Sequence, residues 1–222
     1  MPATRVSAHR LAPRKTPRQL RSQATVEAIV EAAAQVFERY GYAAATTNRI
    51  AARAGVSIGS VYQYFPNKDA ILVALVRRHL TEGTAALWPQ VERLRAGAPI
   101  EEVLADVVEA MVSLHASTPR LHRVLFEETP LPESLRSELD ALEDTLVEVL
   151  ANSLKTQPDI AIRDPNMAAR IAVNSIESLT HRLVLRPLEN ATTESIVNEI
   201  TMLVRAYLLA TSGRAQPGSE SA

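Results

Sequence analysis

The chain has 222 residues, of which 46 % are hydrophobic and 22 % are charged, enough to form a buried core. Only 7 glycines and 4 % aromatic residues argue against β-sandwiches, barrels and glycine-dependent nucleotide folds, so we expect an all-α protein. The absence of cysteine excludes disulfides and thiolate chemistry. No apolar run approaches the roughly 20 residues of a membrane span, and the first residues lack the apolar stretch of a signal peptide, so we expect a cytoplasmic protein without membrane contact.

The formal net charge of −1 conceals an uneven distribution of charge. Residues 1–80 contain 12 Lys and Arg against 4 Asp and Glu, which gives 12 − 4 = +8. Residues 81–222 contain the other 12 bases and 21 acids, which gives 12 − 21 = −9. A basic first third predicts a polyanionic partner for that part of the chain, and a different role for the acidic remainder.

The first predicted helix covers residues 23–40, where apolar side chains recur at helical spacing and Gly41 follows as a C-cap glycine. A longer helix follows Asn67, which can cap it, and can kink at Pro89. Between these two lie two short helices.

The two short helices are separated by a three-residue turn. Thr46 and Thr47 can supply N-cap hydroxyls for a helix over residues 48–54, and Gly55 ends it. Ser57 can cap the next helix, over residues 58–65. This arrangement is typical of a helix-turn-helix, which we assign to residues 46–65.

Prolines and N-cap residues place the remaining helices, because proline is tolerated in the first turn of a helix and breaks its interior. Five are predicted: from Pro99, over Pro119–Phe126, from Pro132 to about Leu154, from Asp164 to about Leu185, and from Thr192 or Thr193 to about Leu209. The chain is thus expected to have about nine helices in four parts: a flexible basic arm (1–20), an N-terminal helix-turn-helix domain (21–80), a larger C-terminal helical domain (81–211) and a disordered tail (212–222).

The helix-turn-helix has the expected steric features. Ala51 is small where the second helix crosses, Gly55 can adopt a left-handed conformation, and Ile50, Val56 and Val61 can hold the helices together. The second helix then faces outward and can enter a DNA major groove. A purely structural corner is the alternative, but this helix lacks acids and displays serine, tyrosine and glutamine.

The run AARAGVSIGSVYQYFPNKD, at residues 51–69, resembles the TetR family of bacterial transcriptional regulators, and the resemblance extends over about residues 19–80. It implies a homodimer on a double-stranded DNA operator. The implied DNA contacts are Thr47, Asn48, Ser57, Ile58, Gly59, Ser60, Tyr62, Gln63, Tyr64 and Lys68. Among these, Gln63 could pair with adenine, and the residues that would meet phosphates are Thr47, Tyr62, Tyr64 and Lys68.

Other basic residues leave two roles open. Arg49 and Arg53 belong to a solvated face or contact phosphates. The arm residues are either a solubilising tail or contacts to the minor groove and phosphates: Arg10, Arg14, Lys15, Arg18 and Arg21.

For the C-terminal domain, the family resemblance implies a small-molecule effector and dimerisation through the helices at 164–185 and 192–209. Bulky or polarisable side chains on the middle helices, with one asparagine, are candidates for contact with an apolar ligand, core packing being the alternative for each. They are Trp88, Met111, His115, His122, Phe126 and Asn174.

A polar stripe follows one face of the helix at 164–185, because its residues are spaced by four, three and four. Its members are Arg170, Asn174, Glu177 and His181. The stripe could face a pocket, a dimer interface or solvent.

No cofactor, metal or catalytic residue is expected. His115 and His122 are seven residues apart, which on one helix means about 10 Å, too far to share an ion. Glycine-rich phosphate loops and nucleophile elbows are absent from the sequence. The hypothesis is therefore a ligand-released repressor on a palindromic operator, with an activator or a regulator controlled by a protein partner as alternatives, and an enzyme or scaffold as the distant one.

Overall fold

The computed structural model describes residues 20–129, 131–157 and 162–210, and every regular element in these ranges is an α-helix. The all-α expectation is confirmed. The predicted tail and residues 1–19 of the predicted arm lie outside the described residues. Within the described ranges, no helix is both long and apolar enough to cross a membrane.

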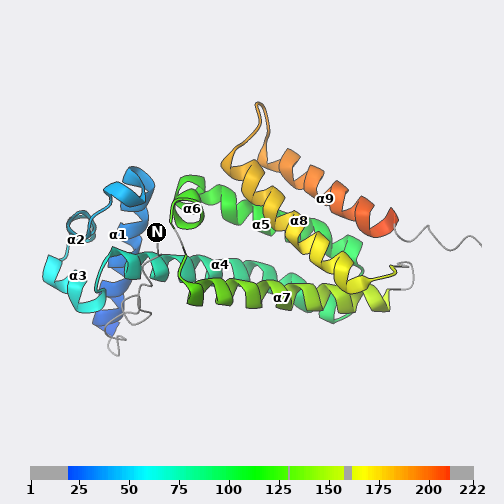
Figure 1. Ribbon diagram of the computed structural model, residues 1–222, viewed down its shortest axis with the longest axis horizontal. Coiled ribbons are helices and arrows are strands. Elements are labelled where there is room, and N and C mark those ends of the chain that lie inside the picture. The colour runs from blue at the N-terminus through cyan, green and yellow to red at the C-terminus, as the bar shows by residue number, and fades with distance from the viewer. Residues whose placement is uncertain (1–19, 130, 158–161, 211–222) are drawn as a thin grey trace, which may run out of the picture. The chain divides into compact units, whose positions relative to one another are not determined.

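Nine helices follow one another along the described chain (Figure 1). They are α1 (Leu20–Ala44), α2 (Thr47–Ala54), α3 (Ile58–Tyr64), α4 (Lys68–Arg95), α5 (Ile100–Ser117), α6 (Pro119–Phe126), α7 (Glu133–Thr156), α8 (Pro165–Leu185) and α9 (Thr193–Ala210). The predicted bounds of α6 and the predicted cap of α8 agree with the structure, in which the Asp164 side chain accepts a hydrogen bond from Met167 N.

The chain divides into two compact units. Unit 1 contains residues up to 82 together with 118–138, and unit 2 contains residues 83–117 and those from 139 onward. The first boundary lies close to the predicted one at residue 80. The sequence places residues 118–138 in the C-terminal domain, however, and their assignment to unit 1 depends on tertiary packing that no local pattern reveals.

Unit 1 is built around side chains from α1 to α4. Phe37, Ile50, Val61, Phe65 and Ile71 are fully or almost fully buried in one apolar cluster. Helix α1 packs against α2 and α6, and α2 packs against α3. Ile50 and Val61 thus hold the two short helices together, in agreement with the sequence pattern.

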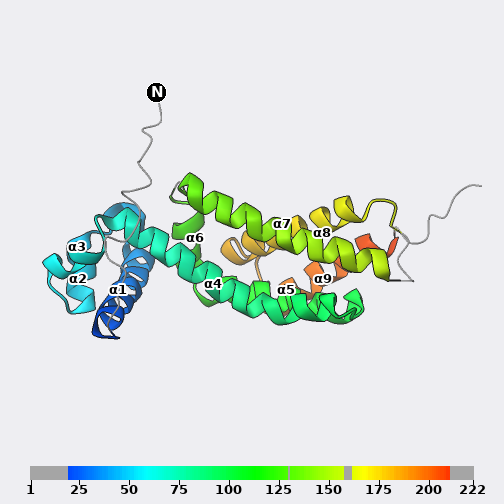
Figure 2. The same ribbon diagram turned by 90° about the horizontal axis from the view of Figure 1, so that it is seen from below.

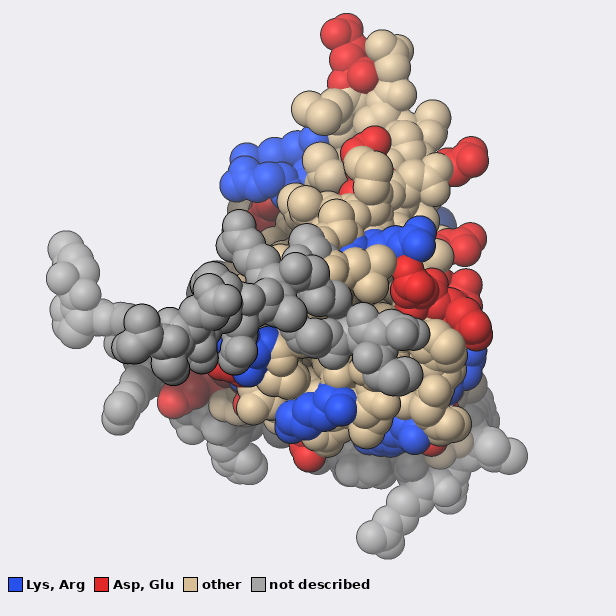
Figure 3. Space-filling model, turned by 90° about the vertical axis from the view of Figure 1, so that its right-hand side faces the viewer, with Lys and Arg blue, Asp and Glu red and all other residues tan. Residues whose placement is uncertain are grey.

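Unit 2 is centred on α5, α8 and α9, which pack against one another and lie side by side in Figures 1 and 2. Small buried residues of α8, Ala168, Ala169 and Ala172, let the neighbouring helices approach closely. Ile200 and Val204 of α9 complete this second core. On the face drawn in Figure 3, acidic and basic side chains are intermixed, so the acidic excess of this part of the sequence does not form a uniform acidic surface there.

Candidate nucleic-acid interface

Local hydrogen bonds fix both short helices of unit 1 at their ends. Thr46 Oγ1 accepts from Arg49 N at 3.2 Å, and Ser57 Oγ accepts from Ser60 N at 3.0 Å. Gly55 ends α2 in the left-handed conformation, with φ 67°, where a side chain would be strained. The predicted turn between α2 and α3 is therefore present.

Helix α3 divides its side chains between the core and the outside. Val61 and Tyr64 are buried, whereas Ile58, Gly59, Tyr62 and Gln63 are exposed. A Cβ added at Gly59 would meet only Ser57 Oγ, at 3.7 Å, so the fold itself does not require glycine there. The exposed face is free of acids and presents an amide, a phenol and hydroxyls.

Tyr62 is linked to the start of α2. Its hydroxyl lies 3.1 Å from Thr47 Oγ1, and 42 % of the residue is exposed. The contact brings together two of the predicted phosphate-binding groups, with the exposed Asn48 next to them. The sequence pattern does not indicate this pairing, because it depends on the angle between the two helices.

Tyr64 is buried, unlike its neighbours Tyr62 and Gln63 on α3. Only 7 % of the residue is exposed, and it belongs to the apolar cluster of unit 1. A buried ring offers little surface to a phosphate, so Tyr64 is not among the DNA contacts that we propose below. Its spacing of three from Val61 could have indicated this, because residues three apart share a helix face.

The Lys68 ammonium makes its contacts within the protein. Its Nζ donates to Tyr42 O at 2.9 Å and to Ala45 O at 3.3 Å, and lies 4.1 Å from the centre of the Tyr42 ring. The Tyr42 hydroxyl donates to Asp69, and Tyr42 N donates to Glu128 Oε2 at 3.3 Å. Burial, reinforced by the hydrogen bond and charge of Asp69, raises the pKa of the Tyr42 phenol. These contacts hold the connection that leads into α2.

Replacing Lys68 with glutamine should therefore weaken DNA binding mainly by loosening the start of α2. We expect the free energy of unfolding to fall by about 2 kcal/mol, because two charged hydrogen bonds to carbonyls are removed. Affinity should drop similarly for all DNA sequences, with an unchanged slope of log K against log salt. Denaturant titration and binding at several salt concentrations measure both quantities. A slope reduced by about 0.9 with unaltered stability would instead assign Lys68 to a phosphate.

The positive charge of the N-terminal third is unevenly placed. Six of its 12 bases lie in residues 1–21, and residues 22–80 hold 6 bases and 4 acids, a net +2. Arg77 is paired with Glu138 at 2.6 Å and Arg78 with Glu31 at 3.1 Å. Residues 46–66 contain Arg49 and Arg53 and no acid, so the charge on the helix-turn-helix itself comes from α2.

The candidate ligand residues are divided between the two units. His122 and Phe126 belong to unit 1, where their rings lie 4.5 Å apart and both contact His79. Met111 and His115 belong to unit 2, and His115 Nδ1 lies 2.7 Å from Met111 O.

The other two candidates, Trp88 and Asn174, are exposed residues of unit 2. Trp88 lies beneath the Arg95 guanidinium at 5.1 Å from its ring centre. The ligand assignment of all six residues stays a prediction.

The sequence excluded a common ion for His115 and His122 on the premise that both lie on one helix, but the structure places them on two. Helix α5 ends at Ser117 and α6 begins at Pro119, so the two histidines lie on different helices. The separation of two helical turns therefore does not apply to them.

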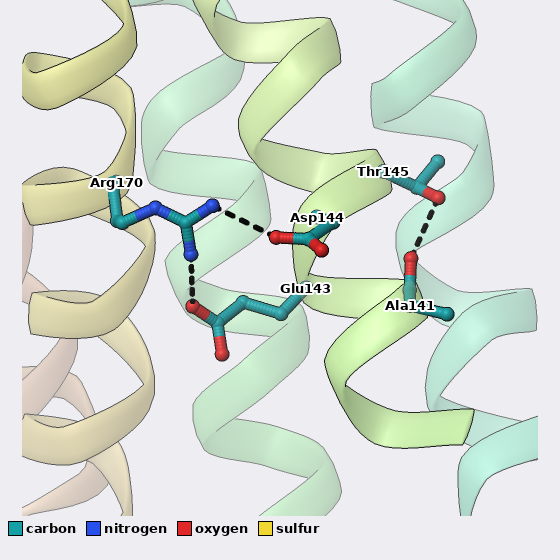
Figure 4. A network of polar contacts seen from close by, with 5 residues as sticks. All are labelled: Ala141, Glu143, Asp144, Thr145 and Arg170. Atoms are coloured by element: carbon teal, nitrogen blue, oxygen red, sulfur yellow. Dashed lines mark hydrogen bonds and ion pairs between the residues drawn. The ribbon is translucent and has the colours of Figure 1, made fainter. Parts of the chain in front are cut away.

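The polar stripe of α8 is directed partly toward its own unit. Arg170 binds Glu143 Oε1 at 3.2 Å and Asp144 Oδ1 at 2.8 Å, both on α7 (Figure 4). The His181 ring contacts the edge of His115 on α5, at 5.1 Å between centres. Desolvation by surrounding protein atoms, and then the charge of Glu143, raise the pKa of Glu177. Arg170 and His181 thus have partners within unit 2, while Asn174 is exposed.

The structure defines a helix-turn-helix protein with a second helical unit. Comparison with known families shows which family of such proteins the chain belongs to. Residues 29–75 match the model of bacterial regulatory proteins of the tetR family. Residues 99–208 match the Tetracyclin repressor-like C-terminal domain. The chain belongs to the TetR family of DNA-binding transcriptional regulators.

Curated relatives share part of the chain. The Fatty acid metabolism regulator protein of Bacillus subtilis (strain 168) is 32 % identical over 93 residues, 42 % of this chain and 46 % of that protein. The A-factor receptor protein of Streptomyces griseus is 36 % identical over 87 residues, 39 % of this chain and 29 % of the relative. The matches thus span less than half of either relative.

Solved structures of regulators resemble the whole fold. A TetR-like transcriptional regulator from Rhodococcus sp. RHA1 has a TM-score of 0.62 at 21 % identity, covering 90 % of this chain and 100 % of that one. The transcriptional regulator FadR from Bacillus subtilis, in complex with stearoyl-CoA, has a TM-score of 0.63 at 23 % identity, covering 80 % and 96 %. At these identities the likeness concerns the fold.

Proposed function

We propose that this protein is a homodimeric repressor that binds a palindromic DNA operator and is released by a small apolar ligand. The observation that carries the proposal is the exposed, acid-free face of α3, on which Gln63 can read a base and Tyr62 can meet a phosphate. Such a regulator would act in the bacterial cytoplasm and needs no catalytic residue.

Exposed apolar side chains on α8 and α9 support the dimer. Met167 and Ile171 lie one turn apart on α8, and Met202 and Leu203 lie on α9. Large apolar residues gathered on neighbouring helices are typical of a protein interface. Pairing these helices with those of a second copy would bury both sets. Asn174 is also exposed and lies three residues after Ile171, on the same side of α8.

A dimer explains why the operator should be palindromic. Each protomer has one recognition helix, and two such helices read half-sites about 34 Å apart, one turn of DNA. A ligand that binds more tightly to a protomer spacing unsuited to DNA must lower DNA affinity, and DNA must lower ligand affinity by the same factor. The FadR structure with stearoyl-CoA makes a long acyl chain a suitable first apolar group to test, offered as the acyl-CoA.

Selection of bound fragments from a random DNA pool tests the proposal. We expect a palindrome to be enriched, with half-sites one helical turn apart, and a footprint covering both. Release of the selected DNA by acyl-CoA, compared with free CoA, tests the class of ligand. Enrichment of no sequence, or of a single asymmetric half-site bound by a monomer, would contradict the homodimeric repressor.

A further inference from the structure

Two arginine guanidiniums share the exposed ring of Tyr40 in unit 1. The Cζ atoms of Arg39 and Arg49 lie 5.3 Å and 4.4 Å from the ring centre. Tyr40 is 40 % exposed, and both arginines are exposed as well. We call Arg39, Tyr40 and Arg49 the Tyr40 cluster. It joins the C-terminal part of α1 to the first turn of α2 and is separate from the exposed face of α3.

The two guanidiniums of the Tyr40 cluster are not neutralised by acids. Among the described residues, neither Arg39 nor Arg49 forms an ion pair. Arg77 and Arg78 of the same unit are, by contrast, paired with Glu138, Glu31 and Glu82. The Tyr40 cluster therefore keeps two positive charges that are available to an anionic partner.

Stacking on Tyr40 prepares these groups for binding. A guanidinium that stacks through its flat face keeps the N–H donors along its edge, which suit phosphate oxygens. A second contact restrains Arg49, because its Nη1 donates to Ala44 O at 2.7 Å. Side chains that are already restrained lose less conformational entropy when they bind.

The position of Arg49 links the cluster to the recognition surface. It lies two residues after Thr47, whose hydroxyl contacts Tyr62 of α3 at 3.1 Å. Both residues belong to the first turn of α2, where the helix dipole adds positive potential. An anion bound there would lie close to the Thr47 hydroxyl and its contact with Tyr62 of α3.

We propose that the Tyr40 cluster binds DNA backbone phosphates next to the bases read by α3, and so supplies sequence-independent affinity. The inference rests on the proposed function, because it assumes that unit 1 docks on DNA through α3. It adds a surface from the end of α1, which no sequence motif indicated.

The test uses the full chain and a non-specific 30-base-pair duplex, with binding measured over a range of salt concentrations. The test variant carries Arg39→Gln and Arg49→Gln. The matched control carries Arg77→Gln and Arg78→Gln, which remove the same charge from arginines already paired with acids. Two further variants, Tyr40→Phe and Tyr40→Leu, keep or remove the aromatic platform without changing charge. Circular dichroism and thermal unfolding check that all four are folded.

We expect the slope of log K against log salt to fall by about 0.9 for each phosphate that is no longer neutralised, or about 1.8 per protomer, in the test variant. The control should keep most of the slope. Tyr40→Phe should behave as the unmodified protein, and Tyr40→Leu should bind several-fold more weakly. Equal slopes in the test and control variants would overturn the inference and leave the proposed function intact. An unmodified protein that binds no duplex at any salt concentration would overturn both.

Discussion

Replacing Tyr62 and Gln63 together with alanine should lower affinity for the selected operator more than 100-fold. A bidentate contact to a base contributes about 1–3 kcal/mol, and a phenolic contact to phosphate adds to it in each half-site. Both side chains are exposed and support no core packing, so the free energy of unfolding should change little. Fluorescence anisotropy with the selected operator measures the decrease, and a sizing column should still show the same oligomeric state.

Single variants separate the two roles. Gln63→Ala should relax the preference at one base pair of each half-site, which a repeated fragment selection would show. Tyr62→Phe should weaken binding to all sequences alike, because it keeps the ring and removes the hydroxyl that is proposed to meet a phosphate. The same hydroxyl contacts Thr47 in the structure. Unchanged operator affinity in the double variant would mean that α3 is not the reading element.

The sequence predicts the helix-turn-helix well because its signals are local. Thr46, Gly55 and Ser57 act within three or four residues of themselves, through capping hydrogen bonds and a left-handed turn. The outward position of Tyr62 and Gln63 follows from the buried position of Val61 next to them. The same periodicity places Tyr64 in the core, whereas the family resemblance led us to expect it among the DNA contacts.

Features that depend on distant partners could not be predicted. The ammonium of Lys68 donates to backbone carbonyls 26 and 23 residues earlier. Every residue has a backbone carbonyl, so the residue types at these positions do not reveal the contact. Arg170 finds Glu143 and Asp144 on another helix, so its place in a polar stripe did not tell where the stripe points. Residues 118–138 join unit 1 although they follow α5 of unit 2 in the chain. Such pairings are set by tertiary packing, which neither spacing nor composition determines.

Placing glutamate at Ile171 and Met202 should convert the proposed dimer into monomers. In the single chain these residues are 40 % and 60 % exposed, so the substitutions should cost little stability within one protomer. In a dimer joined through α8 and α9, four carboxylates would be buried without partners, at a cost of several kcal/mol each. We expect the dissociation constant of the dimer to rise at least about 100-fold, measured by analytical ultracentrifugation.

Leu188→Glu is the matched control for the dimer test. Leu188 is 68 % exposed but lies between α8 and α9 rather than on either helix, so its substitution should leave the dimer intact. The monomeric variant should also lose tight operator binding, because two half-sites on one DNA face are held simultaneously only by linked recognition helices. Since α3 is untouched, binding to an isolated half-site should remain as weak as for one unmodified protomer. A variant that stays dimeric would place the interface elsewhere, whereas a monomer with full operator affinity would show that dimerisation does not determine recognition.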